Sequence, residues 1–215
     1  MGTDAHGGDR AADVAELGHR PRLRWRDVRR LVAAADHDGD GRVRAAAVGA
    51  LVRAGPPRAA GKAWRRALSD PDPAVRRRAV ELAPAVSGTK VVSRLIPRLG
   101  DPDSLVAEAT AAALGELGPS AVEQGAVRAL VNEARTHDDA LVREAAVAAL
   151  GALGDPAGKD AVLAACADRP AVRRRAVLAL AAFSGADVEA ALRAARNDRD
   201  WQTRQAAEDL LSNED

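Results

Sequence analysis

The chain has 215 residues, of which 47% are hydrophobic and 2% aromatic, and it contains no tyrosine. β-Sheets draw on Val, Ile, Tyr and Phe, whereas Ala, Leu, Arg and Glu favour helices, so this composition excludes an all-β fold and predicts an all-α one. The 32 basic and 31 acidic side chains leave a formal net charge of +1. This balance disfavours a protein that binds nucleic acid by bulk positive charge.

The cysteine content and the N-terminal segment restrict the class of protein further. Cys166 is the single cysteine, which excludes an internal disulfide framework and a metal site built only from cysteines. The opening segment MGTDAHGGDRAADVAELG lacks the apolar stretch of a secretory signal, and no run approaches the ~18 apolar residues of a transmembrane helix. We therefore expect a soluble, cytoplasmic, monomeric protein with a mobile polar tail over residues 1–21.

A short pattern recurs along residues 22–215. Segments such as VRAAAVGAL and VREAAVAALG begin at residues 43, 75, 106, 142, 172 and 203, which gives a period of about 31 residues. Three residues before five of these six anchors stands an aspartate that suits a helix N-cap: Asp40, Asp72, Asp103, Asp139 and Asp200. The pattern predicts that each repeat is a helix A, a short turn and a helix B.

The helices A are predicted where an apolar stripe precedes each turn, and the helices B where small or apolar residues follow each anchor. In chain order the stripes begin at Trp25, Trp64, Val92, Val127, Val162 and Val188. Pro84 should kink or end the second helix B early. An insertion of about five residues is expected around Gly118-Pro119-Ser120, and Gly115 and Gly151 are expected near helix C-termini.

The sequence pattern D-x-D-P-x-V-R-x-x-A-V-x-x-L, with Leu-Gly-x-Leu late in helix B, resembles HEAT repeats of the phycobilisome-lyase type. Pro97 lies in a helix A where such repeats often carry a kinking proline. The resemblance covers residues 22–215 and implies an α-solenoid of about six stacked two-helix repeats. In such a stack, helix faces that carry alanine pack closely against the neighbouring repeat. Two repeats depart from the pattern, since Ala107 replaces the anchor arginine of the third and the fifth lacks the capping aspartate.

Arginines recur directly after the anchors, and each follows a turn aspartate: Arg44, Arg76, Arg143, Arg173 and Arg204. A guanidinium can hold a carboxylate through two parallel hydrogen bonds. We therefore predict a structural ladder in which each arginine bonds turn carboxylates of its own or an adjacent repeat.

Several motifs that suggest chemistry have a simpler structural interpretation. Asp36, Asp38 and Asp40 begin like a calcium loop, but Ala47 stands where the bidentate glutamate would be needed. The four histidines are scattered without metal-ligand spacing, and the chain lacks the His-Glu dipeptides of the HEAT-like iron hydroxylases. Cys166 lies on an apolar stripe and is expected to be a core residue. No catalytic residue, cofactor site or metal site is predicted.

The exposed side of helix B lines the concave surface in HEAT stacks, and it carries the candidate partner-binding residues. They are Arg77, Arg78, Glu81, Glu108, Glu144, Arg174 and Arg175. Their charge alternates along the repeats, whereas a nucleic-acid groove needs continuous positive charge. Alternating charge suits a protein or peptide partner, and a merely solvated face is the alternative.

The sequence thus favours a non-enzymatic scaffold or adaptor that binds a protein or peptide. Two enzymatic alternatives share the architecture: an alkylpurine DNA glycosylase built from HEAT-like repeats, and a bilin lyase or isomerase. The first would need an aromatic platform for a damaged base, and the second a pocket with aromatics and a nucleophile. The sequence indicates neither.

Overall fold

The computed structural model describes residues 4–212, and the regular elements in that part of the chain are fourteen α-helices and four short 3-10 helices. The predicted all-α fold is confirmed. The chain divides into two compact units, Met1–Val91 and Val92–Asp215, called here the N-terminal unit and the C-terminal unit. None of the described helices is both long and apolar enough to cross a membrane.

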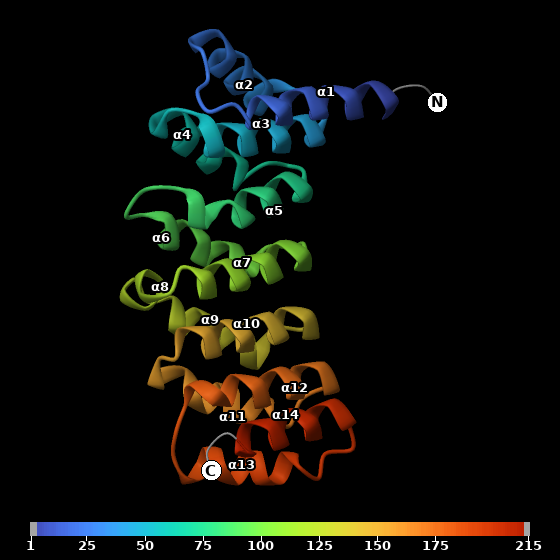
Figure 1. Cartoon of the computed structure of the whole chain (residues 1–215), viewed down its shortest axis with the longest axis vertical. Helices are drawn as coiled ribbons and strands as arrows, with labels where there is room; N and C mark the ends of the chain where they lie inside the picture. Colours follow the sequence, from blue (N-terminus) through green and yellow to red (C-terminus); the bar gives the residue numbers. More distant parts are fainter. Residues whose placement is uncertain (1–3, 213–215) are drawn as a thin grey trace. The chain divides into compact units, whose positions relative to one another are not determined.

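The N-terminal unit holds the first two repeats. Its elements are α1 (Asp4–Leu17), α2 (Trp25–His37), α3 (Gly41–Ala54), α4 (Pro57–Ala67), α5 (Pro73–Glu81) and η1 (Ala83–Ala85). The pairs α2/α3 and α4/α5 are the helices A and B of these repeats. Because α2 packs on α4 and α3 packs on α5, the helices form one row of A and one row of B (Figure 1).

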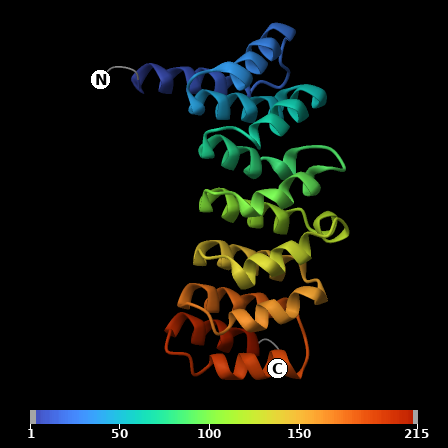
Figure 2. The same cartoon turned by 180° about the vertical axis from the view of Figure 1, so that it is seen from behind.

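The C-terminal unit holds the remaining four repeats. Its elements are α6 (Val91–Leu95, which starts at the unit boundary), η2 (Ile96–Gly100), α7 (Ser104–Glu116), α8 (Pro119–Glu123), α9 (Ala126–Thr136), α10 (Ala140–Leu153), η3 (Pro156–Gly158), α11 (Lys159–Ala165), α12 (Pro170–Ala179), η4 (Leu180–Ala182), α13 (Ala186–Ala195) and α14 (Trp201–Ser212). The helices B pack in the order α7, α10, α12, α14. Figure 2 shows the same stack from behind.

The irregular positions lie where proline and the insertion predict them. Helix α5 ends at Glu81, and Pro84 lies within the 3-10 turn η1 that follows it. Pro97 lies in η2, so the third helix A changes from α to 3-10 geometry after Leu95. The insertion forms α8, whose first helical residue is Pro119. Proline is tolerated in a first helical turn because no hydrogen bond is lost there.

Within the segment expected to be a tail, residues 1–21, the helix α1 spans Asp4–Leu17, and the first three residues lie outside the described part. Val14 and Leu17 of α1 are buried, and the helix packs on α3. Gly18 follows α1 at a close approach, because a Cβ atom there would lie 2.8 Å from Ala50 Cα. A terminal repeat needs its apolar face covered, and α1 covers α3 at the N-terminal end of that unit's B row.

Gly115 and Gly151 do not act as helix C-caps. Both lie inside their helices, and the left-handed C-cap of α10 is Gly154 (φ 62°). A Cβ atom on Gly151 would lie 2.6 Å from Ala179 Cβ on α12, and one on Gly115 would lie 3.0 Å from Ala149 Cα on α10. Glycine is therefore needed here for close helix packing rather than for a turn.

The tryptophans have different roles in the fold. Trp64 on α4 is fully buried, and its Nε1–H donates to Ala79 O at 2.7 Å. Trp25, which the apolar stripe placed in the core, is the first residue of α2 and is 73% exposed. A first-turn side chain reaches beyond the packed stripe, so the periodicity overestimated its burial.

Candidate functional site

The turn edge, defined as the A–B turns with the anchor arginines, is held by paired charges. In the N-terminal unit, Arg44 Nε and Nη2 donate to the two carboxylate oxygens of Asp70 at 2.9 and 2.7 Å. Its Nη1 donates to Asp38 O of its own turn at 2.9 Å. Burial raises the pKa of Asp70, but hydrogen bonds from Arg44 and the Asp72 amide outweigh it, so the pKa lies below its usual range. One arginine thus ties two successive turns together.

The C-terminal unit repeats this arrangement twice. Arg143 holds Asp168 through two hydrogen bonds of 2.7 and 2.8 Å, and Arg173 holds Asp198 through two of 2.9 and 2.8 Å. These hydrogen bonds lower the pKa of Asp168 and of Asp198. All four side chains are mostly shielded from solvent. We call each such bidentate pair, including Arg44–Asp70, an Arg–Asp rung.

The remaining predicted ladder residues also bond the backbone of the turns. Arg76 Nη1 donates to Asp70 O at 2.9 Å, and Arg204 Nη1 donates to Asp198 O at 2.8 Å. The capping aspartates accept from the first-turn amides of their helices B, as the side chains of Asp40, Asp72, Asp103, Asp139 and Asp200 do. Each of the five predicted ladder arginines thus bonds a turn, and three of them also form an Arg–Asp rung.

The B-helix face is defined as the side of helix B that carries positions two, three and six after each anchor. Unlike the turn edge as described above, it combines small residues with charged ones. In the N-terminal unit it forms a hollow of about 510 Å³ between α3 and α5 beside α1. The small residues Ala45, Ala46 and Gly49 lie on α3, while Arg77, Arg78 and Glu81 lie on α5. The predicted strip residues of α5 thus line one concavity with an alanine-rich wall.

Glu81 is shared between two arginines at this hollow. Its carboxylate accepts from Arg77 Nε at 3.1 Å and from Arg78 Nη1 at 3.1 Å. Arg53, one helical turn beyond Gly49, also lines the hollow, and among the described residues no carboxylate pairs with it. Burial and the nearby charge of Arg78 lower the pKa of Arg53. The periodicity Ala46, Gly49, Arg53 is helical, so extending the strip by one turn would have found this residue.

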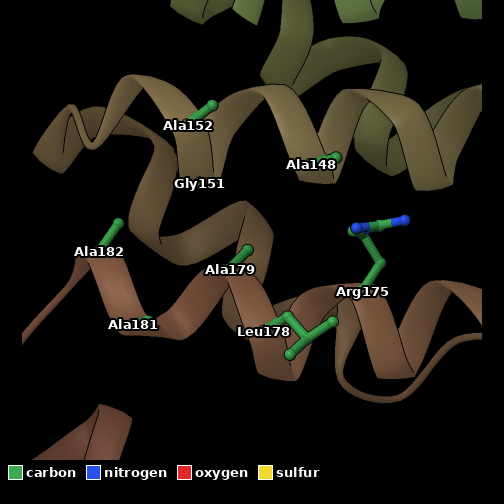
Figure 3. Close-up of a pocket in the computed structure, with 8 residues that line it drawn as sticks. All are labelled: Ala148, Gly151, Ala152, Arg175, Leu178, Ala179, Ala181 and Ala182. Carbon is green, nitrogen blue, oxygen red and sulfur yellow. The ribbon is translucent and has the colours of Figure 1, made fainter. Parts of the chain in front are cut away.

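In the C-terminal unit a second hollow, of about 380 Å³, lies between α10 and α12 (Figure 3). Alanines and Gly151 form most of its wall: Ala148, Gly151, Ala152, Ala179, Ala181 and Ala182. Leu178 lines the hollow and is 43% exposed. Arg175 extends from α12 toward α10 at one end (Figure 3).

Arg175 is only partly satisfied inside the protein. Its Nη2 lies 3.5 Å from Glu144 Oε1, a long contact, while its Nε is buried and has no hydrogen-bond partner in the described chain. A buried donor without an acceptor is destabilising, and such groups are rare in folded proteins. The hollow therefore presents apolar surface, and the Arg175 side chain at its end is 42% exposed although its Nε is buried.

The other predicted strip residues lie apart from the hollows. Arg174 hydrogen bonds Gln202 across to α14, and Glu108 is half-buried on α7. Cys166 is partly exposed at the end of α11, and burial of its thiol raises the pKa to about 11. A thiol with this pKa is protonated near neutral pH and is a weak nucleophile. Among the described residues, no group of three or more His, Cys, Asp or Glu is placed to hold a metal ion.

Comparison with family models decides the identity of the repeats. The model for HEAT repeats matches residues 61–128 and 127–212, which is most of the chain. The chain belongs to the HEAT-repeat family. The Arg–Asp rungs and capped turns described above are therefore features of the turn edge of HEAT repeats in this chain. A comparison with curated protein sequences found no match.

Solved structures share the fold of this HEAT-repeat protein. An engineered protein aligns with a TM-score of 0.61 at 21% identity, covering 87% of this chain and 96% of its own. A designed armadillo repeat protein in complex with the peptide (KR)4 aligns with a TM-score of 0.56 at 16% identity, covering 93% and 97%. The complex of CpcE and CpcF of phycocyanin lyase from Nostoc sp. PCC7120 aligns with a TM-score of 0.54 at 22% identity, covering 100% and 84%.

Proposed function

We propose that the protein is a non-enzymatic interaction module that binds a protein or peptide partner on its B-helix face. The observation that carries this proposal is the α10–α12 hollow, which combines an exposed leucine, an alanine wall and the partly exposed guanidinium of Arg175. An apolar partner side chain fits against Leu178, and a partner carbonyl or carboxylate accepts from the solvent-facing end of the Arg175 guanidinium, whose side chain is 42% exposed. Small residues let a partner's backbone approach both helices closely.

The contrast with the turn edge supports the assignment of the binding surface. At the turn edge Arg143 and Arg173 are held in Arg–Asp rungs, whereas on the B-helix face Arg53 has no carboxylate partner in the described chain and Arg175 has only a long contact with Glu144. Charged and polar groups of this kind give an interface specificity and speed of encounter. The designed armadillo protein that holds the peptide (KR)4 supports peptide binding as a use of this class of fold.

The enzymatic alternatives have less support. A glycosylase of this architecture needs an aromatic platform, but Trp64 is buried. The exposed Trp25 and Trp201 are the first residues of α2 and α14, and neither lines the two hollows of the B-helix face. A bilin lyase needs a nucleophile, and the raised pKa of Cys166 keeps that thiol protonated. The likeness to the phycocyanin lyase complex is a likeness of fold at 22% identity. A base-release assay on methylated DNA and an absorbance scan with added bilin, both expected to be blank, test these alternatives.

Affinity capture from the source lysate with the full chain tests the proposed function. We expect a partner that is retained by the wild type and lost with Leu178→Glu, because a charge then replaces the apolar contact. Arg175→Lys keeps the charge but removes the guanidinium fork, and it should weaken capture several-fold. The matched control is Leu141→Glu, which changes a similarly exposed leucine (41%) at the start of α10, outside the hollow.

The circular dichroism spectrum of each variant establishes that it is folded. Capture that is equal for the wild type and Leu178→Glu would overturn the assignment of this face. Capture that is lost equally with Leu141→Glu would contradict the proposed location of the partner.

A further inference from the structure

The hollow between α3 and α5 carries more positive charge than its own residues neutralise. Arg53, Arg77 and Arg78 line it, and Glu81 is the acidic residue among its lining residues. One carboxylate is thus shared by two guanidinium groups at 3.1 Å, and a third guanidinium has no carboxylate partner in the described chain. The lining therefore has two positive charges in excess.

Two of these guanidinium groups converge on the same point. A Cβ atom placed on Gly49 would lie 3.3 Å from Arg53 Nη1 and 3.7 Å from both Nε and Nη2 of Arg78. Like charges this close repel each other, and burial with the charge of Arg78 lowers the pKa of Arg53 accordingly. An anion between the two groups would remove that repulsion and accept charge-assisted hydrogen bonds from both.

We propose that the α3–α5 hollow binds an acidic segment of a protein partner, with an Asp or Glu carboxylate seated between Arg53 and Arg78 over Gly49. This inference names the chemistry of the partner on the B-helix face, and in that sense it rests on the proposed function. The alanines beside Gly49 take the small apolar residues that flank the carboxylate. Glu81 is the internal competitor, because its carboxylate already occupies Arg77 and Arg78.

A peptide fits these observations better than a nucleic acid does. The positive charge of this hollow stands beside an alanine wall, and the formal net charge of the whole chain is +1. A nucleic-acid surface extends its cations along a track of phosphates. Glu81 at the rim also opposes a ligand with closely spaced charges.

The test measures fluorescence anisotropy of a labelled peptide of alternating Glu and Ala residues titrated with the full chain at low and moderate salt. We expect binding that weakens with salt and falls about tenfold or more with Arg53→Glu/Arg78→Glu, because both hydrogen-bonding cations are reversed. Glu81→Gln should strengthen binding several-fold, since the competing carboxylate is gone. This second variant keeps the proposal testable if the double reversal fails to fold.

The matched control is Arg58→Glu/Arg65→Glu, which makes the same charge change at exposed positions of α4 outside the hollow. Its affinity should stay within about twofold of the wild type, because distant exposed charges are screened by salt. An equal loss with this control, no peptide binding, or equally tight binding of a single-stranded oligonucleotide of the same charge would overturn the inference. If Leu178→Glu still abolishes partner capture while the acidic peptide fails to bind, the inference fails alone and the proposed function stands.

Discussion

Arginines on two sides of the same helices have contrasting surroundings. On the turn edge, Arg143 and Arg173 each hold one carboxylate with two hydrogen bonds of 2.7 to 2.9 Å and also bond a backbone carbonyl of their own turn. On the B-helix face, Arg53 has no carboxylate partner in the described chain, and Arg175 leaves its buried Nε without an acceptor. The turn edge therefore uses arginine to join repeats, whereas Arg53 and Arg175 on the B-helix face make no bidentate carboxylate pair within the described chain.

The largest expected effect comes from breaking an Arg–Asp rung. Arg143→Ala leaves Asp168 without its bidentate partner and two turn carbonyls, those of His137 and Asp138, without their donor. We expect the free energy of unfolding to fall by about 2–3 kcal/mol, measured by urea denaturation followed by circular dichroism. Arg128→Ala, at an exposed position of α9, is the control and should change the free energy by less than about 0.5 kcal/mol. Similar values for the two variants would show that the rung is not structural.

The Asp168 carboxylate of the same rung makes the free energy of unfolding depend on pH. Hydrogen bonding to Arg143 lowers the pKa of Asp168 below its unfolded value of about 3.9. The stabilisation is present above the unfolded pKa and is lost as the pH falls through the lower folded pKa, because the unfolded chain then binds the proton first. Asp168→Asn should cost about 1–2 kcal/mol at pH 7. Urea midpoints from pH 6 to 2.5 should decline less steeply for Asp168→Asn than for the wild type, and parallel curves would contradict this.

The repeat frame could be predicted from the sequence because the turn edge repeats its chemistry. A capping aspartate and an anchor arginine recur at fixed offsets, so the turns could be located without a structure. In the third repeat the arginine and its receiving aspartate are absent together. This repeat has Ala107 in place of the arginine, and the following turn has His137 at the position of the receiving aspartate, so both halves of that rung are missing. His137 keeps only the local role, since its Nδ1 accepts from the Asp139 amide at 3.1 Å.

The hollows could not be predicted in the same way, because they depend on packing between helices. The offsets from the anchors placed Arg77, Arg78 and Glu81 on one face but stopped one helical turn short of Arg53, which lines the same hollow. The unpaired state of Arg175 Nε depends on its distance from Glu144 on α10. The glycines of α7 and α10 were assigned to helix ends because the sequence does not show how closely the next helix approaches.

A smaller effect tests how close packing shapes the B-helix face. Gly151→Ala places a methyl group 2.6 Å from Ala179 Cβ and 2.9 Å from its Cα, so α10 and α12 must move apart. Overpacking of about 1–3 kcal/mol outweighs the ~1 kcal/mol gained in helix propensity, and we expect a net destabilisation of about 1 kcal/mol. Gly61→Ala is the matched control inside α4, where the new methyl group meets only the flexible end of Arg65 at 3.4 Å. It should stabilise the protein by about 0.5–1 kcal/mol, and equal signs for the two variants would contradict the packing argument.

The smallest expected effect on stability comes from removing Arg53, and it distinguishes the arginines of the B-helix face from those of the turn edge. Arg53→Ala removes a guanidinium that repels Arg78 and has no carboxylate partner in the described chain, so no stabilising ion pair is lost. The free energy of unfolding, measured by urea denaturation, should change by less than about 0.5 kcal/mol in either direction. The same variant should weaken binding of the acidic peptide, whereas Arg143→Ala should lower stability and leave binding by the folded protein unchanged. A loss of about 2 kcal/mol with Arg53→Ala would mean that the B-helix face uses its arginines as the turn edge does, to hold the fold together.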